Sequence, residues 1–286
     1  NNVALGYNAL LAGTTETDDN VAIGYNAMSG AIGTEQVNDC IAIGSGALSG
    51  ALDSTDGADE ASGTIAIGKS ALAALTDGHK NTAIGYLALT ANTQGDNSVA
   101  VGYQSLMAQN GVNGEYSNTA VGMQSGKALT TGRYSVAIGF EALLTEDVGD
   151  FSTAVGYAAL YAQNSGSTVT TNNTGIGGYA GLYNVTGVNN TYVGASAGLG
   201  VTGNSNSDNT GVGKDALKGI TTGIENTAVG SDSLEANTTG NYNVAVGGNA
   251  LIVATTGDSN TGIGYNALTA TSTGQYNTAV GSAALA

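Results

Sequence analysis

The residues that could perform acid–base, nucleophilic or metal chemistry are few in this 286-residue chain. It contains one histidine, His79, and one cysteine, Cys40. His79 lies in a polar stretch with Asp77, Gly78 and Lys80, which is typical of an exposed turn, and no catalytic triad can be assembled around it. A single cysteine excludes an intrachain disulfide, and Cys40 is expected to be a small buried thiol. The sequence therefore predicts that the protein is not an enzyme.

Carboxylates occur as pairs and as one cluster. The pairs Glu146–Asp147 and Asp18–Asp19 fall in predicted corner loops, where solvated side chains are expected rather than a glycosidase pair. A fibre-borne glycan-degrading enzyme is kept only as a further alternative. The cluster supplies hard oxygen atoms that calcium prefers, or forms a solvated acidic loop: Asp53, Asp56, Asp59 and Glu60. Neither an EF-hand loop nor the glycine-rich calcium-binding repeat is present, so no cofactor is assigned and calcium stays an open alternative.

The charge balance of the chain excludes some partners. There are 22 acidic and 6 basic residues, which gives a formal net charge of −16. Nucleic acid is excluded as a partner because phosphate binding needs a cationic face, and an anionic membrane surface is disfavoured for the same reason. No apolar run approaches the roughly 18 residues of a membrane span, so no membrane insertion is expected in this segment. The acidity is expected to keep the protein soluble.

A short repeat organises the whole chain. Its core reads Asn-Thr-Ala-Val-Gly and then Tyr or another residue, followed after one more residue by Ala-Leu. Nine of the fifteen spacings between the motif glycines are 17 residues, and a fixed short period is typical of a solenoid. The sixteen motif glycines are Gly6, Gly24, Gly44, Gly68, Gly85, Gly102, Gly122, Gly139, Gly156, Gly177, Gly194, Gly213, Gly230, Gly247, Gly264 and Gly281.

The three residues before each motif glycine predict a β-strand. The first and third are β-branched almost throughout, and the middle one is alanine in twelve repeats. Because residues two apart share one face of a strand, we expect the β-branched pair to point inward and the alanine outward. The leucine after the glycine is expected to start a second inward-facing strand. The predicted fold is thus all-β: a parallel β-solenoid of sixteen coils of about 17 residues, with two short strands per coil, forming one domain over 1–286.

The residue four positions before the motif glycine is asparagine in eleven repeats. Stacked coils bring equivalent side chains to about 4.8 Å, where asparagines form an amide ladder. Cys40 occupies one position of this column. The predicted ladder consists of Asn2, Asn20, Asn81, Asn118, Asn173, Asn190, Asn209, Asn226, Asn243, Asn260 and Asn277.

An aromatic residue follows the motif glycine in seven repeats. These side chains would either stack on glycan rings or pack over small neighbours and across a subunit interface. Non-aromatic residues such as Met123, Gly178 and Ala195 interrupt the column, which argues against one continuous site. The candidate surface or interface aromatics are Tyr7, Tyr25, Tyr86, Tyr103, Phe140, Tyr157 and Tyr265.

The motif resembles a known repeat. Asn20-Val21-Ala22-Ile23-Gly24-Tyr25-Asn26-Ala27 and Ser98-Val99-Ala100-Val101-Gly102-Tyr103-Gln104-Ser105 are similar to the head repeats of trimeric autotransporter adhesins (the YadA-like head) and to bacteriophage tail-fibre shaft repeats. This resemblance covers essentially the whole chain. It implies a left-handed, trimeric β-roll that is extracellular, at a cell surface or on a virion. The coil is longer than the compact adhesin repeat, which favours the fibre-type variant.

Function is therefore expected to lie in the surface. The leading hypothesis is a structural and adhesive fibre segment, part of a longer fibre, that attaches to a cell surface or links a virion to its host through multivalent contacts. The expected partners are further copies of the chain, as a trimer or an end-to-end fibre, and a cell-surface receptor or glycan. The alternative is a module that binds an ordered surface such as ice or crystalline polysaccharide. The sequence does not identify the receptor, the host or the oligomeric state.

Overall fold

The computed structural model describes residues 1–11, 17–30, 37–52, 61–111, 114–167 and 170–286. Within these ranges the regular elements are β-strands, and no helix is present. The chain divides into two compact units, Asn1–Phe140 and Glu141–Ala286, and each unit repeats the same coil. The prediction of one repeat domain over 1–286 stays a prediction.

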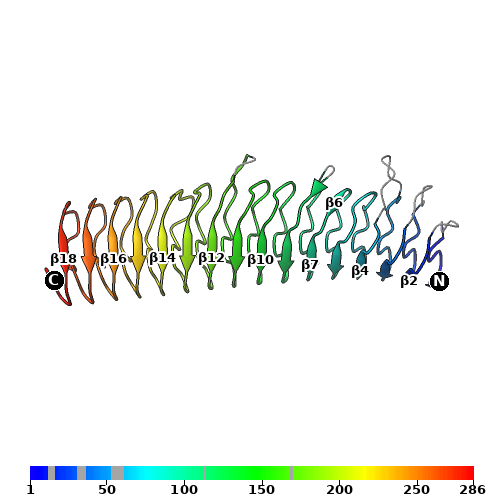
Figure 1. Cartoon of the computed structure of the whole chain (residues 1–286), viewed down its shortest axis with the longest axis horizontal. Coiled ribbons are helices and arrows are strands. Elements are labelled where there is room, and N and C mark those ends of the chain that lie inside the picture. The colour runs from blue at the N-terminus through cyan, green and yellow to red at the C-terminus, as the bar shows by residue number, and fades with distance from the viewer. Residues whose placement is uncertain (12–16, 31–36, 53–60, 112–113, 168–169) are drawn as a thin grey trace. The chain divides into compact units, whose positions relative to one another are not determined.

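The first unit contains ten strands. Its three-residue strands run parallel to one another in Figure 1. Eight are three-residue strands that precede a motif glycine, and β6 and β8 are two-residue strands in a separate small sheet. The strands are β1 (Val3–Leu5), β2 (Val21–Ile23), β3 (Ile41–Ile43), β4 (Ile65–Ile67), β5 (Thr82–Ile84), β6 (Gly95–Asp96), β7 (Val99–Val101), β8 (Gly114–Glu115), β9 (Thr119–Val121) and β10 (Val136–Ile138).

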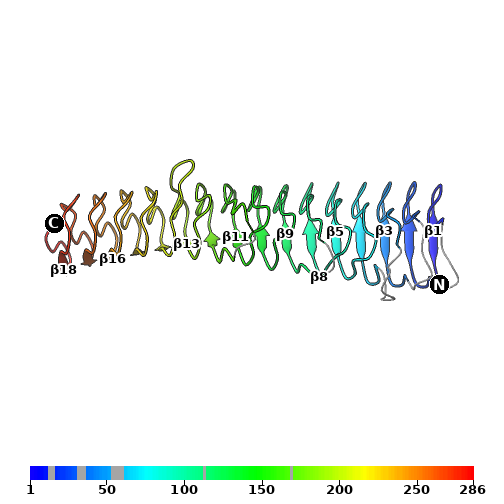
Figure 2. The same ribbon diagram turned by 90° about the horizontal axis from the view of Figure 1, so that it is seen from above.

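The second unit contains eight strands, and each again ends at a motif glycine. They are β11 (Thr153–Val155), β12 (Thr174–Ile176), β13 (Thr191–Val193), β14 (Thr210–Val212), β15 (Thr227–Val229), β16 (Val244–Val246), β17 (Thr261–Ile263) and β18 (Thr278–Val280). In both units the three-residue strands follow chain order in a parallel sheet, sixteen strands in all. Neighbouring strands lie side by side in Figure 2. Pairing is in register, and Thr261 lies opposite Thr278. The predicted parallel β-solenoid is confirmed.

The prediction of which strand residues point inward was wrong. In β2 to β18, the middle residue of each three-residue strand is buried, whereas the first and last are half-buried or exposed. Ala228 is fully buried, for example, while the side chain of Val229 is 38% exposed. The coil interior is thin, and it is filled from the opposite wall by leucine, so only a small middle residue fits. A Cβ added to Gly262, the middle residue of β17, would lie 3.3 Å from Leu251 Cγ.

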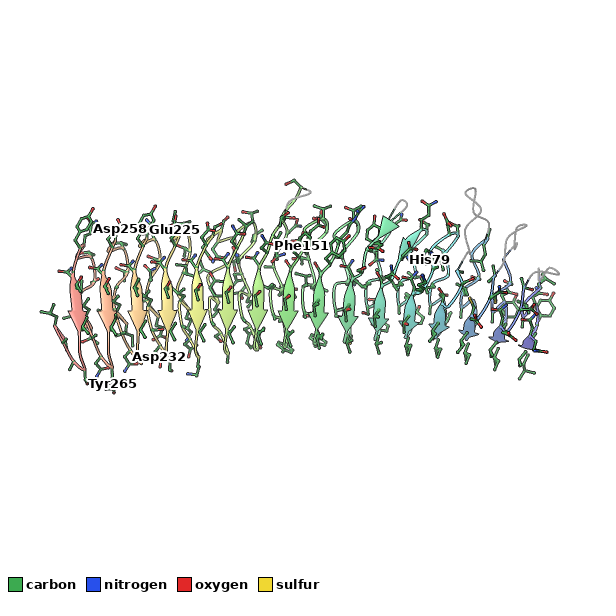
Figure 3. The ribbon with its side chains drawn as sticks, viewed as in Figure 1. His79, Phe151, Glu225, Asp232, Asp258 and Tyr265 are labelled. Atoms are coloured by element: carbon green, nitrogen blue, oxygen red, sulfur yellow. The ribbon has the colours of Figure 1, made fainter. Side chains whose placement is uncertain are left out.

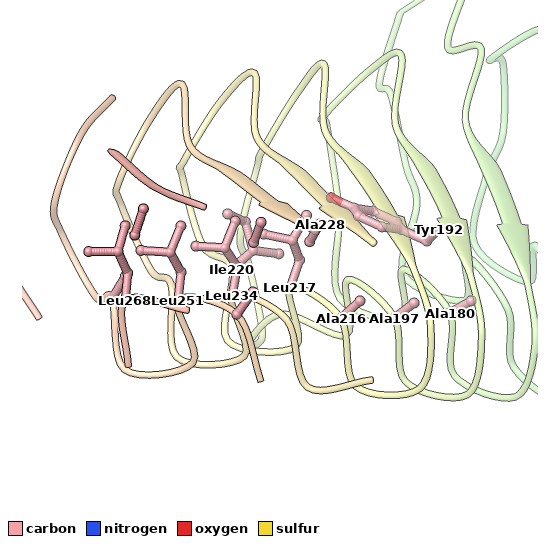
Figure 4. Close-up of a cluster of buried hydrophobic side chains, with 14 residues drawn as sticks. Ala180, Tyr192, Ala197, Ala216, Leu217, Ile220, Ala228, Leu234, Leu251 and Leu268 are labelled. Carbon is pink, nitrogen blue, oxygen red and sulfur yellow. The ribbon is translucent and has the colours of Figure 1, made fainter. Parts of the chain in front are cut away.

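The core of each unit is therefore built from alanine and leucine. In the second unit, successive leucines form a row inside the coils, as Figure 4 shows for Leu217, Leu234, Leu251 and Leu268. Each of these leucine side chains is at most 1% exposed to solvent. One coil contributes too little apolar surface to fold alone, so stability depends on stacking between neighbouring coils.

Among the described residues, the predicted second strand after the motif leucine is not formed. The leucine of the motif adopts a left-handed backbone with φ between about 46° and 55° in every repeat that has it, for example 48° at Leu234. An extended strand cannot contain this conformation, so the segment runs as successive turns. These turns still pair between coils, since the Leu234 N–H donates to Ala250 O at 3.0 Å and the Ala236 N–H to Ile252 O at 3.1 Å.

The motif glycines form the tight corner after each strand. Gly230 has φ of 137°, which residues with a Cβ rarely adopt. A Cβ at Gly230 would also lie 2.6 Å from the carbonyl carbon and oxygen of Gly247 in the next coil. The glycine is therefore required both by its conformation and by the close approach of neighbouring backbones.

Candidate functional site

The outward side of the sheet is a surface that recurs from coil to coil. We call the first and last residues of the three-residue strands the outer sheet face. In the first unit this face is apolar in both columns, apart from Thr82 and Thr119. Ile84, Val121 and Ile138 are each 37–38% exposed. Six of the eight strands of the first unit thus present two adjacent aliphatic side chains outward.

In the second unit the same face has a different composition. The first residue of each strand is threonine except for Val244, and the last is valine or isoleucine. In register, Thr174 lies opposite Thr191 and Ile176 opposite Val193, and this pattern continues from β11 to β15. The face therefore presents a row of hydroxyl and methyl groups next to a row of aliphatic groups at the strand spacing of about 4.8 Å.

The predicted ladder asparagines of the second unit are linked to one another by hydrogen bonds from coil to coil. The Asn226 side-chain oxygen accepts from the Asn243 backbone N–H at 3.0 Å and from its side-chain amide at 3.1 Å. The same amide of Asn243 donates to Gly257 O at 2.8 Å. Asn260 and Asn277 repeat this arrangement. These side chains satisfy buried backbone groups and are not available to a ligand.

Cys40 occupies the asparagine column and is fully buried. Its backbone N–H donates to the Asn20 side-chain oxygen at 2.9 Å, and its thiol donates to Ala61 O at 2.9 Å. Burial raises the pKa of the thiol from 9.0 to about 11. The side chain is therefore a neutral thiol at physiological pH rather than a nucleophile.

Aromatic residues after the motif glycine lie on the surface and contact one another in pairs. Tyr7 and Tyr25 stack with ring centroids 5.5 Å apart, and Tyr86 and Tyr103 stack at 5.4 Å. Phe140 is half-buried. Tyr265 is 59% exposed and points outward in Figure 3. Stacked pairs cover one ring face each, so these sites offer limited aromatic surface to a partner.

Tyr157 differs from the other members of its column. Its ring meets Tyr179 edge to face, with centroids 5.1 Å apart and an interplanar angle of 75°. The two rings line an open surface hollow of about 290 Å³ with Tyr161, Tyr183 and Glu141. The neighbouring Tyr179 and partial burial raise the pKa of Tyr157. Sequence reasoning found only Tyr157 of this group, because the other tyrosines stand outside its column.

The ionisable residues considered for catalysis have structural partners or are exposed. His79 lies at a corner, where its Nδ1 is 3.3 Å from Asp96 Oδ1 (Figure 3). Glu146 is buried, and its carboxylate accepts from the Gly149 N–H and the Gln163 side-chain amide, both at 2.8 Å. Its neighbour Asp147 is partly exposed, and the Asp18–Asp19 pair is exposed.

The proposed calcium ligands Asp53, Asp56, Asp59 and Glu60 lie outside the described residues. Among the residues that are described, no group of three or more histidine, cysteine, aspartate or glutamate side chains is arranged to hold a metal ion. In the same residues, no helix has the length and apolar character needed to cross a membrane.

Comparison of the sequence with models of known protein families, and with curated proteins, finds no match. Function is therefore inferred from the surfaces described above.

Proposed function

We propose that the chain is a structural and adhesive fibre segment whose copies associate through the outer sheet face. The observation that supports this is the aliphatic surface of the first unit, where Ile84, Val121 and Ile138 are each more than a third exposed. Contiguous apolar surface of this kind on a soluble protein marks an interaction site. A homotrimer is the proposed assembly, in line with the resemblance to YadA-like heads and tail-fibre shafts.

Such a fibre acts mechanically and by multivalency. Within each unit, backbone hydrogen bonds connect neighbouring coils on the strand side and on the turn side, as between Leu234 and Ala250. A repeated surface then presents the same contact many times, which raises avidity without a deep pocket. The proposed location is outside the cell or on a virion, and the proposed target is a cell-surface receptor or glycan.

Sedimentation equilibrium of the chain tests the assembly. The native protein is expected to have the mass of three chains of 27.9 kDa. The double variant Ile84→Asp/Val121→Asp places charges on the outer sheet face and should sediment as a monomer with an unchanged circular dichroism spectrum. The matched control Asn110→Asp/Thr239→Asp adds the same charge at exposed corner positions and should stay associated. A native monomer would overturn the proposal.

A second candidate is binding to an ordered surface such as ice or crystalline polysaccharide. It is favoured by the outward threonine row of β11 to β15, beside the aliphatic row. A flat, regular array of hydroxyl and methyl groups fits a lattice better than it fits a solvated surface. This candidate needs the outer sheet face to be free, so it competes with association through the same face.

Thermal hysteresis and pull-down on microcrystalline cellulose test the second candidate. A monomeric native protein that shows either activity, and loses it in Thr191→Leu/Thr210→Leu, would favour surface binding over the fibre. Absence of both activities would reject it.

A further inference from the structure

The aromatic column is interrupted beside the hollow that Tyr157 and Tyr179 line. In the first unit, Tyr7 stacks on Tyr25 from the next coil. The residue that would stack on Tyr157 in the same way is Gly178, and a Cβ added there would meet no atom within 4 Å. The position beside Tyr157 in the following coil thus carries no side chain that could fill the neighbouring space.

Backbone pairing fixes the walls of this hollow. Tyr179 N–H donates to Tyr157 O at 2.9 Å, and Ala162 N–H donates to Leu182 O at 2.9 Å. Tyr179 is displaced by one position from the aromatic column, so its ring meets Tyr157 at 75° instead of covering it. Tyr161 and Tyr183 complete the wall from the following turns. The tyrosines are therefore held by stacked coils and not by a long loop.

The charges around the hollow determine whether a cationic or an anionic ligand can bind there. Among the described residues that line it, Glu141 is the one ionisable side chain besides the tyrosines, and none is basic. The chain as a whole carries −16. Aromatic faces are negative and attract cations within about 6 Å of the ring centre. The protein already makes such contacts elsewhere, since Arg133 lies 5.0 Å from the centre of the Tyr116 ring.

The available groups also distinguish between kinds of cation. A metal ion such as calcium needs about six to eight oxygen ligands, and one carboxylate with tyrosine hydroxyls does not supply them. A primary ammonium group is strongly hydrated and would lose water on binding. The mainly aromatic wall does not supply the hydrogen-bond acceptors that would replace this water. A quaternary ammonium group is weakly hydrated, and its methyl groups pack on aromatic rings while its charge faces the ring and the carboxylate.

We propose that the hollow formed by Glu141, Tyr157, Tyr161, Tyr179 and Tyr183 binds a small quaternary ammonium group, as found in choline. Tyr157 and Tyr179 supply the ring faces and Glu141 supplies the countercharge. The site lies on the turn side of the coil and does not depend on association through the outer sheet face.

Ligand-observed saturation-transfer NMR and calorimetry on the whole chain test this proposal with choline chloride as the probe. The matched ligand is 3,3-dimethylbutan-1-ol, which has the shape of choline without its charge. Choline is expected to bind saturably and about fivefold or more tightly than this neutral analogue. Tyr157→Ala should weaken choline binding by about fivefold, and Glu141→Gln should weaken it with little change in the shape of the hollow.

The control variant is Tyr265→Ala, which removes an exposed tyrosine of the same column away from the hollow. It should leave choline binding unchanged, and all variants should keep the native melting temperature. Additional binding to phosphatidylcholine vesicles would identify a lipid headgroup as the source, whereas binding to free choline alone would indicate a soluble or polymer-borne ammonium. Equal affinity for the neutral analogue, tighter binding of a neutral pyranoside, or no saturable choline binding would each overturn the proposal.

Discussion

The side-chain oxygen of Asn226 accepts two hydrogen bonds from Asn243 in the next coil, one from the backbone N–H and one from the side-chain amide. The amide of Asn226 in turn donates to Gly240 O at 2.8 Å. One side chain thus bonds with two buried backbone groups of the next coil. Because a buried group left without a partner costs about 1–3 kcal/mol, this column contributes to stability at every coil where it is repeated.

Asn226→Ala is expected to lower the free energy of unfolding by about 2–4 kcal/mol, since the Asn243 N–H and the Gly240 carbonyl both lose a partner. The midpoint of urea unfolding measures the change. Thr239→Ala, at an exposed position of the same coil, is the control and should have little effect. A midpoint for Asn226→Ala equal to that of the control would contradict the structural role of the ladder.

Gly230→Ala is expected to be strongly destabilising, because a Cβ at this corner meets the Gly247 backbone at 2.6 Å and φ is 137°. Neither strain can be relieved by a side-chain movement, so loss of the folded state or a shift of several degrees in melting temperature should follow. Gly178→Ala is the matched control, since its Cβ would enter open space. The prediction fails if both variants melt at the same temperature.

Tyr192 and Gly198 form a compensating pair. Tyr192 replaces the usual small middle residue of β13 and is fully buried, and a Cβ at Gly198 would collide with its ring. Its hydroxyl bonds with the Asn206 side-chain oxygen. Gly198 has φ of 58°, close to the 54° of Leu217 at the equivalent place in the next coil. The position therefore suits leucine once the ring is removed.

Tyr192→Ala alone should cost about 3–5 kcal/mol because it leaves a cavity. Gly198→Leu alone should be at least as damaging, because the core has no room for both side chains. The double variant Tyr192→Ala/Gly198→Leu restores the alanine–leucine pattern and should recover most of the lost stability. A double-mutant cycle in urea measures the coupling, and simple additivity would show that the two residues do not compensate.

The buried thiol of Cys40 predicts a change of stability with pH. Its pKa is raised from 9.0 to about 11 because burial disfavours the thiolate, so the native state holds the proton more tightly than the unfolded state. The stabilising contribution is therefore complete below pH 9.0 and is lost as the pH rises toward about 11. Its full size is roughly 3 kcal/mol.

Iodoacetamide labelling followed by mass spectrometry checks the state of this thiol. At about pH 8.5 the native protein should react far more slowly than the protein in concentrated urea. In parallel, the stability of the native chain relative to Cys40→Ser should fall between pH 9.0 and 11. Rapid labelling of the native chain at that pH would be inconsistent with a buried thiol.

Much of the fold follows from local pattern. The β-branched residues before each motif glycine predict the strands, and all sixteen three-residue strands end directly before a motif glycine. The asparagine column predicts side chains that lie close enough to form hydrogen bonds from coil to coil. These features are readable because a stacked repeat places equivalent residues next to one another, so position in the repeat is also position in space.

The sequence by itself thus determined the repeat, the all-β class and the positions of the strands and corners. It did not determine which face of the strand is buried, because a period of two residues only says that Thr227 and Val229 share a face. That choice depends on Leu234 and its equivalents, whose left-handed backbone was not foreseen and which fill the coil from the opposite wall. The tyrosine-lined hollow likewise required the tertiary structure, since the pairing of neighbouring coils sets Tyr179 edge to face with Tyr157.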